Sequence, residues 1–269
     1  MANETIPQPY DLASKPLVEA IFELRWALKS TGSLESDPGF SLFQGRYWDR
    51  IKEDYPFALQ LPVAAVPEHM TAHTVRHQFR RGEKEWPVTQ IGPGILTVND
   101  TADYRWETFL PQLEKAIAAL YEGYPTEQSP LKPTQASLRY INVIDYDPNS
   151  SEVPLLRFLK DSLHTTIIPE PLLFDENINP EAPNGLSLNL AYQVESRNAL
   201  ASTTFALGQA NNKPALIFEI HVQTIPNNVP QNPADFSSWV TGAHDIVDKW
   251  FFALVRGELL ETYGNTNAD

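Results

Sequence analysis

Regular alternation of apolar and polar side chains is the feature that most restricts the fold of this 269-residue chain. In residues 18–26 every second side chain is apolar, and Glu19, Glu23 and Arg25 lie between them. Residues 185–196 and 215–224 alternate in the same way. Successive side chains of a strand point to opposite faces, so these segments are predicted to be strands with one buried and one polar face. Such strands are typical of antiparallel sheets.

The remaining periodic segments complete a repeated order of elements. Further strands are predicted at residues 71–80, 94–99, 135–146 and 201–207. Helices are predicted where apolar residues recur at three- and four-residue steps, at residues 40–55, 102–121 and 151–164, and in a final helix capped by Asp235 and ended by Gly264. The order strand, helix, several strands, long helix therefore occurs twice.

This order predicts an α+β protein made of two pseudo-duplicated β-α-β-β-(β)-α units. We expect an N-terminal arm at residues 1–15, a first half at 16–130 and a second half at 131–269. One continuous curved antiparallel sheet with helices on one face is favoured over two independent domains, because a half of about four strands would leave an exposed edge. The arrangement is similar to the TATA-binding-protein type of architecture, a likeness of fold that carries no function.

Composition excludes several classes of function. The net charge is −14 and neither half is basic, which disfavours nucleic acid as the main ligand. The absence of cysteine excludes disulfides, thiolate catalysis and cysteine-ligated zinc. No apolar run is long enough to span a bilayer, and the first residues lack the pattern of a secretion signal. We therefore expect a cytoplasmic protein that does not enter a membrane.

The stretch QIGPGILTVND at residues 90–100 has the glycines of a phosphate-binding loop but not the rest of its pattern. Pro93 removes a backbone donor, and the β-branched run that follows predicts a strand where a phosphate loop needs a helix. Gly92 and Gly94 are therefore predicted to form a tight turn.

Two further patterns resemble metal sites. His69, His73 and His77 stand at four-residue steps, but on a strand such residues lie about 13 Å apart and could not share one ion. Residues 145–149 resemble the start of a calcium loop, yet Ser150 and Leu156 replace its glycine and its glutamate, which favours a turn. No metal or cofactor is expected.

Catalytic signatures are absent from the sequence, including the nucleophile elbow, the zinc-protease pair, the P-loop, the dinucleotide fingerprint and the kinase motifs. We therefore expect a non-enzymatic protein with no catalytic residue. Five of the six tryptophans fall on periodic faces and are predicted to lie in the core. Trp86 is the exception, because it lies in a loop beside Pro87 and is expected to be an exposed anchor or a plug over the sheet end.

Four motifs carry a family resemblance. PLVEAIFELRW at residues 16–26, QIGPGILTVND at 90–100, YRWETFLPQL at 104–113 and RYIN at 139–142 together resemble a sporadically distributed prokaryotic family with no established function. The resemblance implies a cytoplasmic protein encoded on mobile or defence-related gene clusters. It implies no catalytic residues.

The candidate binding residues lie on the polar sides of the predicted strands: Glu19, Glu23, Arg25, Arg76, Arg80, Arg139, Glu219 and His221. We expect a protein-binding module, such as an inhibitor, an antitoxin-like subunit or a defence-associated accessory protein, that binds a protein partner and forms a homodimer. The alternative is a sensor or enzyme that binds an anionic, nucleotide-like small molecule in a cleft between the halves, with Arg25, Arg76 and Arg139 as a clamp. Arg139 is expected to face solvent, a partner or a buried acid such as Glu23.

Overall fold

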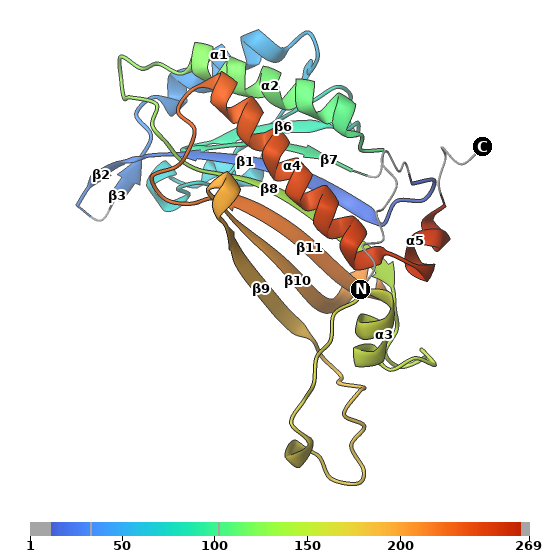
Figure 1. Cartoon of the computed structure of the whole chain (residues 1–269). Coiled ribbons are helices and arrows are strands. Elements are labelled where there is room, and N and C mark those ends of the chain that lie inside the picture. Colours follow the sequence, from blue (N-terminus) through green and yellow to red (C-terminus); the bar gives the residue numbers. More distant parts are fainter. Residues whose placement is uncertain (1–11, 33, 102, 265–269) are drawn as a thin grey trace.

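The computed structural model describes residues 12–32, 34–101 and 103–264. Nine strands form one antiparallel sheet in the order β4-β5-β6-β7-β1-β8-β11-β10-β9, and β2 and β3 form a separate hairpin (Figure 1). The strands are β1 (Leu17–Trp26), β2 (Lys29–Thr31), β3 (Leu34–Ser36), β4 (Phe57–Gln60), β5 (His77–Arg80), β6 (Val88–Gly92), β7 (Ile95–Asp100), β8 (Pro133–Asp145), β9 (Ser187–Val194), β10 (Ala199–Ala210) and β11 (Lys213–Thr224). The α-helices are α1 (Phe40–Ile51), α2 (Trp106–Gly123), α3 (Leu155–Ser162), α4 (Pro233–Val255) and α5 (Glu258–Tyr263). The prediction of an α+β protein with a large antiparallel sheet is confirmed.

Helices α1, α2 and α4 lie side by side over one face of the sheet, while α3 and α5 lie at its far end (Figure 1). The core fills the space between these two layers. Phe22, Leu24 and Trp26 of β1 point into it and are fully buried, together with Leu138 of β8 and Phe218 of β11. Within the described residues, no helix is long and apolar enough to cross a membrane.

The start of β1 differs from the predicted alternation. Val18 was expected in the core but is 42% exposed, and Leu17 is buried in its place. The pairing of β1 with β8 is irregular between Leu17 and Glu19, where one extra residue enters β1. Such a bulge shifts the side-chain alternation by one position, so the pattern holds only from Ala20 onward.

Two other predicted elements are interrupted by residues with positive φ. The predicted strand at 71–80 is a turn followed by the short strand β5, and His73 adopts a φ of 53° in that turn. The final helix is divided into α4 and α5 at Gly257, whose φ is 83°. Its N-cap is Asn232, not Asp235: the Asn232 side chain accepts a hydrogen bond of 3.0 Å from the Asp235 backbone N–H.

Strand β6 was not predicted from the sequence, and one tryptophan was predicted in the wrong environment. Strand β6 is five residues long and includes Gly92, so its alternation is too brief to stand out. Trp48 on α1 was expected in the core but is 37% exposed. Trp86 is 38% exposed, and the Arg80 guanidinium lies 5.1 Å from its ring centre.

The two predicted halves meet in the middle of the sheet, where β1 pairs with β8 along most of its length. Strands β7 to β4 continue the sheet on one side of this pair and β11 to β9 on the other. Residues 1–11 of the predicted N-terminal arm lie outside the described residues. The end of the arm is tied to α5, because the Ser14 N–H donates to the Tyr263 carbonyl at 2.8 Å.

Candidate functional site

The face of the sheet opposite α1, α2 and α4 carries most of the predicted binding residues, and we call it the polar face. Strand pairing places Glu23 of β1 beside Ser137 of β8, and Arg139 of β8 beside His221 of β11. Its polar side chains are those of Gln78, Arg80, Gln90, Thr97, Asn99, Glu19, Glu23, Arg25, Gln135, Ser137, Arg139, Glu219, His221 and Gln223, and the apolar side chains of Ile21, Ile95 and Ile141 lie among them on the same face. Within the described residues, no α-helix covers this face.

A directed chain of hydrogen bonds crosses the first half of the polar face, one strand at a time. The Gln78 amide N–H donates to the Gln90 side-chain oxygen at 2.6 Å, and the Gln90 amide donates to the Asn99 side-chain oxygen at 3.1 Å. The Asn99 amide donates in turn to the Glu19 carboxylate at 2.8 Å. Arg80 begins the chain by donating to Gln78 at 3.3 Å. A chain that runs from a cation to a carboxylate polarises each bond in the same direction, which fixes these side chains in place.

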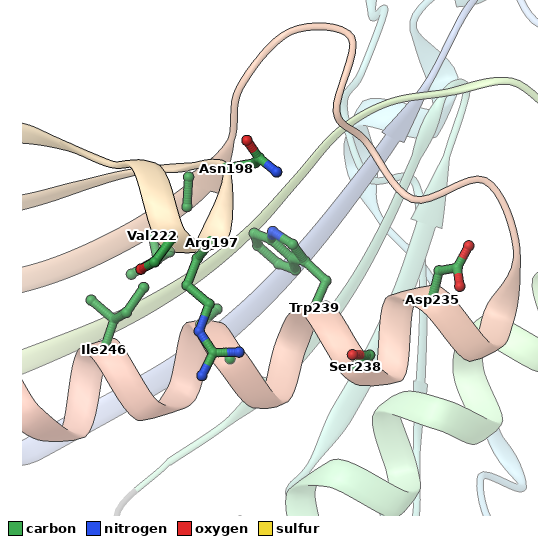
Figure 2. A pocket seen from close by; sticks show the side chains of 11 residues that line it. Arg197, Asn198, Val222, Asp235, Ser238, Trp239 and Ile246 are labelled. Carbon is green, nitrogen blue, oxygen red and sulfur yellow. The ribbon is translucent and has the colours of Figure 1, made fainter.

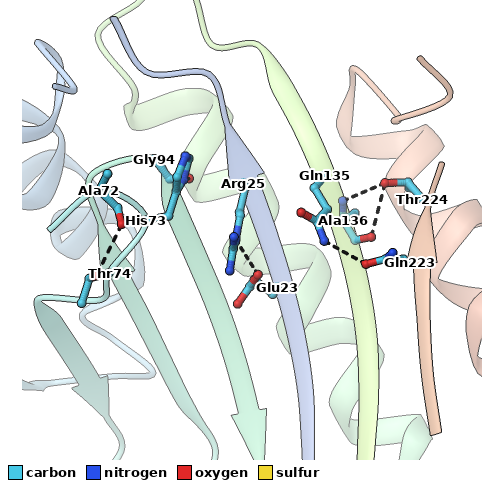
Figure 3. A network of polar contacts seen from close by, with 10 residues as sticks. All are labelled: Glu23, Arg25, Ala72, His73, Thr74, Gly94, Gln135, Ala136, Gln223 and Thr224. Atoms are coloured by element: carbon cyan, nitrogen blue, oxygen red, sulfur yellow. Dashed lines mark hydrogen bonds and ion pairs between the residues drawn. The ribbon is translucent and has the colours of Figure 1, made fainter. Parts of the chain in front are cut away.

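Ion pairs and amide pairs occupy the centre of the polar face. The Arg25 guanidinium lies 2.7 Å from the Glu23 carboxylate on the same strand. Across the neighbouring strands, the Gln135 amide donates to Gln223 at 3.0 Å, as Figure 3 shows. The Arg139 guanidinium lies 3.7 Å from the Glu219 carboxylate, and its side chain is 41% exposed. It therefore faces solvent, as one of the expected alternatives had it, and the acid beside it is Glu219 where Glu23 had been suggested.

Partial burial shifts the pKa of two groups beside Arg139. The pKa of the Glu219 carboxyl is raised by loss of solvent, and the Arg139 charge only partly opposes this. The pKa of His221 is lowered by the same loss of solvent and by the Arg139 charge, while Glu23 acts in the opposite direction. His221 is therefore neutral at physiological pH and can both donate and accept a hydrogen bond.

One end of the polar face is covered by the segment of residues 61–76. A Cβ atom on Gly92 would lie only 1.9 Å from the Thr74 carbonyl oxygen, so the segment packs directly on β6. Arg76 belongs to this segment and is only 8% exposed, with its guanidinium donating to the carbonyls of Val63 and Val66. Of the predicted binding residues, Arg76 is therefore the one that the structure separates from the others.

The Gly-Pro-Gly turn between β6 and β7 binds a carboxylate of the same chain, that of Asp37. The Gly94 N–H donates to the Asp37 carboxylate at 3.1 Å, and Gly94 has a φ of 74°. The same carboxylate accepts from Trp26 Nε1 at 2.9 Å, from the Tyr124 hydroxyl at 2.6 Å and from the Gly39 N–H at 3.1 Å. Asp37 is 3% exposed, so this buried carboxylate joins β1, the turn and the ends of α1 and α2.

A second buried polar cluster lies under α4. The Tyr140 hydroxyl contacts the Tyr104 hydroxyl and lies 3.0 Å from His244 Nδ1. The His244 ring stacks on Trp106 with ring centres 3.9 Å apart. Burial lowers the pKa of His244 to about 4, so the ring is neutral near pH 7.

A small pocket lies between α4 and the 3-10 turn Glu195–Arg197 that follows β9 (Figure 2). Its volume is about 270 Å³, and Trp239, Ala243 and Ile246 form its apolar wall. Arg197 crosses its rim and pairs with Asp245 on α4 at 3.1 Å.

The residues that resembled metal ligands serve other contacts. His73 Nδ1 lies 3.0 Å from the Gly94 carbonyl, and the His77 ring packs near Phe40. Asp147 accepts from the Asn149 N–H and the Ser150 hydroxyl, both at 2.9 Å, which closes a turn before α3 as expected. Nowhere in residues 12–32, 34–101 and 103–264 do three His, Asp or Glu side chains gather as ligands for one ion.

Several residues of the polar face were not found from the sequence. Gln90 was missed because β6 was missed, whereas Gln78 and Asn99 lay inside the predicted strands 71–80 and 94–99 and were not singled out because they carry no charge. Asp37 gave no signal, because it lies in a loop and its donors come from distant parts of the chain.

Comparisons with known proteins add nothing to this site: no protein-family model matches the chain, and no curated protein sequence does.

Proposed function

We propose that this chain is a non-enzymatic protein-binding module that binds its partner on the polar face. The observation that carries the proposal is a large sheet face, uncovered by any described α-helix, whose polar side chains are already held in one arrangement by hydrogen bonds from Arg80 to Glu19. An antiparallel sheet can leave one face to solvent, but solvent alone does not require such a chain of directed bonds.

Preorganisation is what makes this face suitable for recognition. Binding normally requires mobile side chains to be ordered, at a cost of about 0.5–1.5 kcal/mol for each flexible side chain. Glu19, Glu23 and Arg25 are half-buried and hydrogen-bonded before any partner arrives. Much of that ordering cost is therefore already met within the fold.

The charge of the chain indicates the chemistry of the partner. A net charge of −14 attracts a basic protein and speeds its encounter with the polar face. On the face itself, Arg25 and Arg139 each pair with a carboxylate, whereas Glu19 is held by the neutral amide of Asn99. A basic group of the partner could therefore pair with the Glu19 carboxylate. An inhibitor or antitoxin-like subunit of a basic protein fits this pattern.

The anionic-ligand alternative has less geometric support. It requires Arg25, Arg76 and Arg139 to converge, yet Arg76 is buried against carbonyl groups. The other two arginines lie on the polar face beside carboxylates, which would repel an anion. We therefore do not advance it as a second function.

We further propose that the halves arose by duplication and that the chain belongs to the prokaryotic family that its motifs resemble. Support for duplication comes from the element order on either side of the β1–β8 pair, in which a strand, a helix, a run of paired strands and a long helix occur twice. The TATA-binding-protein likeness rests on the same order. A cytoplasmic, defence-associated role rests on the family resemblance alone.

The test begins with capture of the tagged protein from its source organism at low salt and identification of the bound protein. The affinity of the purified companion is then measured for the original chain and for two variants with equal charge change. Glu23→Lys alters the polar face, whereas Asp49→Lys alters an exposed position on α1. We expect Glu23→Lys to weaken binding about tenfold or more and Asp49→Lys to have little effect.

Two outcomes contradict the proposal. Equal weakening by both variants would show that only the overall charge matters. Recovery of a bound nucleotide or metabolite with no protein companion would favour the alternative, in which the chain binds a small molecule.

A further inference from the structure

Strand β9 forms one outer edge of the sheet, and none of the described strands pairs with its free side. It is eight residues long, Ser187–Val194, and every one of its side chains is exposed or half-buried, with Tyr192 54% exposed. It contains no proline and no charged residue. Proteins usually protect an edge strand by charge, proline or a bulge, because its free N–H and C=O groups can pair with another chain.

The opposite edge of the sheet is protected in this way. Strand β4 has only four residues, Phe57–Gln60, and lies between Pro56 and Pro62. Proline cannot donate to a strand ladder, so a partner strand could pair with β4 over a very short length only. The two edges therefore differ, and β9 is the one able to accept a further strand.

Residues 166–186, which we call the projecting loop, lie directly before β9 and extend past the end of the sheet (Figure 1). Its tip carries large apolar side chains in solvent: Ile168 is 84% exposed, Leu172 92% and Leu173 72%. Its charged residues, from Glu170 to Glu181, are all acidic. An apolar group of this kind on a projecting segment is typical of a contact surface.

The opposite end of β9 provides a complementary surface. The 3-10 turn Glu195–Arg197 follows β9 directly, and the pocket beneath it is lined by Trp239, Ala243 and Ile246 (Figure 2). Arg197 places a half-exposed positive charge on the pocket rim. This end of the strand is therefore an apolar pocket whose rim carries the Arg197–Asp245 ion pair and Asp235, and the shared feature of the two ends is their exposed apolar side chains.

We propose that two copies of this chain associate by antiparallel pairing of their β9 strands, with the projecting loop of each copy packed against the Arg197 end of the other. Antiparallel pairing sets the first residue of one β9 beside the last residue of the other, so each projecting loop meets the partner copy's pocket. The contact is the same on both copies and closes with twofold symmetry. Because β9 carries no charged residue, this pairing brings two acidic chains together without placing like charges opposite each other along the strands. The two Glu195 side chains lie at opposite ends of the contact.

Sedimentation of the full chain over a wide range of micromolar concentrations tests the proposal, with two matched variants. Ala191→Lys places two lysines close to the twofold axis, whereas Ala58→Lys makes the same change at an exposed position of the β4 edge. We expect the unaltered chain to be a dimer, Ala191→Lys to weaken the dimer about tenfold or more, and Ala58→Lys to leave it unchanged. Replacement of both Leu172 and Leu173 by serine should also weaken it.

A monomer at every concentration would overturn the proposal. A dimer that Ala191→Lys does not weaken, or that Ala58→Lys weakens equally, would overturn it too, because another surface would then be responsible. The Glu23→Lys variant should remain dimeric, so failure of the polar face to bind a partner and failure of β9 to pair are separate results.

Discussion

Removal of the Asp37 carboxylate should be among the most destabilising single changes in this chain. Asp37→Ala leaves four donors without an acceptor: the N–H groups of Gly39 and Gly94, the Trp26 indole and the Tyr124 hydroxyl. Trp26 is fully buried and Tyr124 is 4% exposed. A buried donor left without a partner costs about 1–3 kcal/mol, so even the lower bound gives a loss of about 4 kcal/mol.

Asp37→Asn should cost less, about 2 kcal/mol, for a reason that the geometry supplies. The Trp26 and Gly94 N–H groups share one carboxylate oxygen, and the Tyr124 hydroxyl and the Gly39 N–H share the other. If the asparagine amide group takes the second position, the Tyr124 hydroxyl can rotate and accept from it. The Gly39 N–H and the Tyr124 hydroxyl hydrogen then lack an acceptor, whereas the Trp26 and Gly94 N–H groups keep theirs, and the charge of the acceptor is also lost.

Urea unfolding at 25 °C, with the free energy of unfolding taken from the midpoint at constant slope, measures both losses. Asp49→Ala is the control, because the Asp49 carboxylate lies on the exposed side of α1, and its midpoint should stay near that of the unaltered chain. A loss below about 1 kcal/mol for Asp37→Ala would refute the reasoning, since it would mean that water or a rearrangement satisfies the four donors.

Further changes test the packing and the titration of the fold. Gly92→Ala should destabilise the chain strongly, because its Cβ would lie 1.9 Å from the Thr74 carbonyl oxygen, whereas Gly45→Ala on α1 meets no atom within 4 Å and should stabilise it by about 0.5–1 kcal/mol; urea midpoints that move in the same direction would contradict this pair. The folded-state pKa of His244, about 4, lies below the unfolded value of 6.5. As the pH falls, the His244 side chain therefore takes up a proton in the unfolded chain before it does so in the folded chain. The free energy of unfolding should fall as the pH drops from about 6.5 to about 4. Thermal unfolding across that range should show a smaller fall for His244→Gln, and an identical fall would contradict the assignment.

Local pattern predicted most of the sheet, because alternation records which side of a strand faces the core. It failed where one residue changed the alternation, as at the bulge beside Val18, and where the strand was too short, as at β6. It also could not detect the positive φ of His73, which depends on the contact of residues 72–74 with the turn at Gly94.

The polar face was predictable in outline and not in detail. Glu19, Glu23, Arg25 and Arg139 could be placed on one face from alternation within their own strands. Their partners could not, because strand order and register decide that Arg139 meets Glu219 and that Asn99 meets Glu19. Arg76 was misplaced for a related reason. It was assigned to a strand at 71–80, but it lies in the segment before β5, and the carbonyls of Val63 and Val66 that accept its hydrogen bonds come from another part of the chain.

The order of strands also determines what is exposed while the chain is being synthesised. Strands β4 to β7 and β1 all lie before residue 101, so the first half can assemble early, and β8 follows to cover the free edge of β1. The other edge of β8 waits for β11, and residues 146–212 must be made first. At about 5–20 residues per second, a ribosome needs roughly 3–13 seconds for that stretch. During those seconds one edge of β8, a thirteen-residue strand rich in side chains that are buried in the folded protein, has no partner strand. We therefore expect β8 to be the segment through which nascent chains bind a chaperone or aggregate with one another.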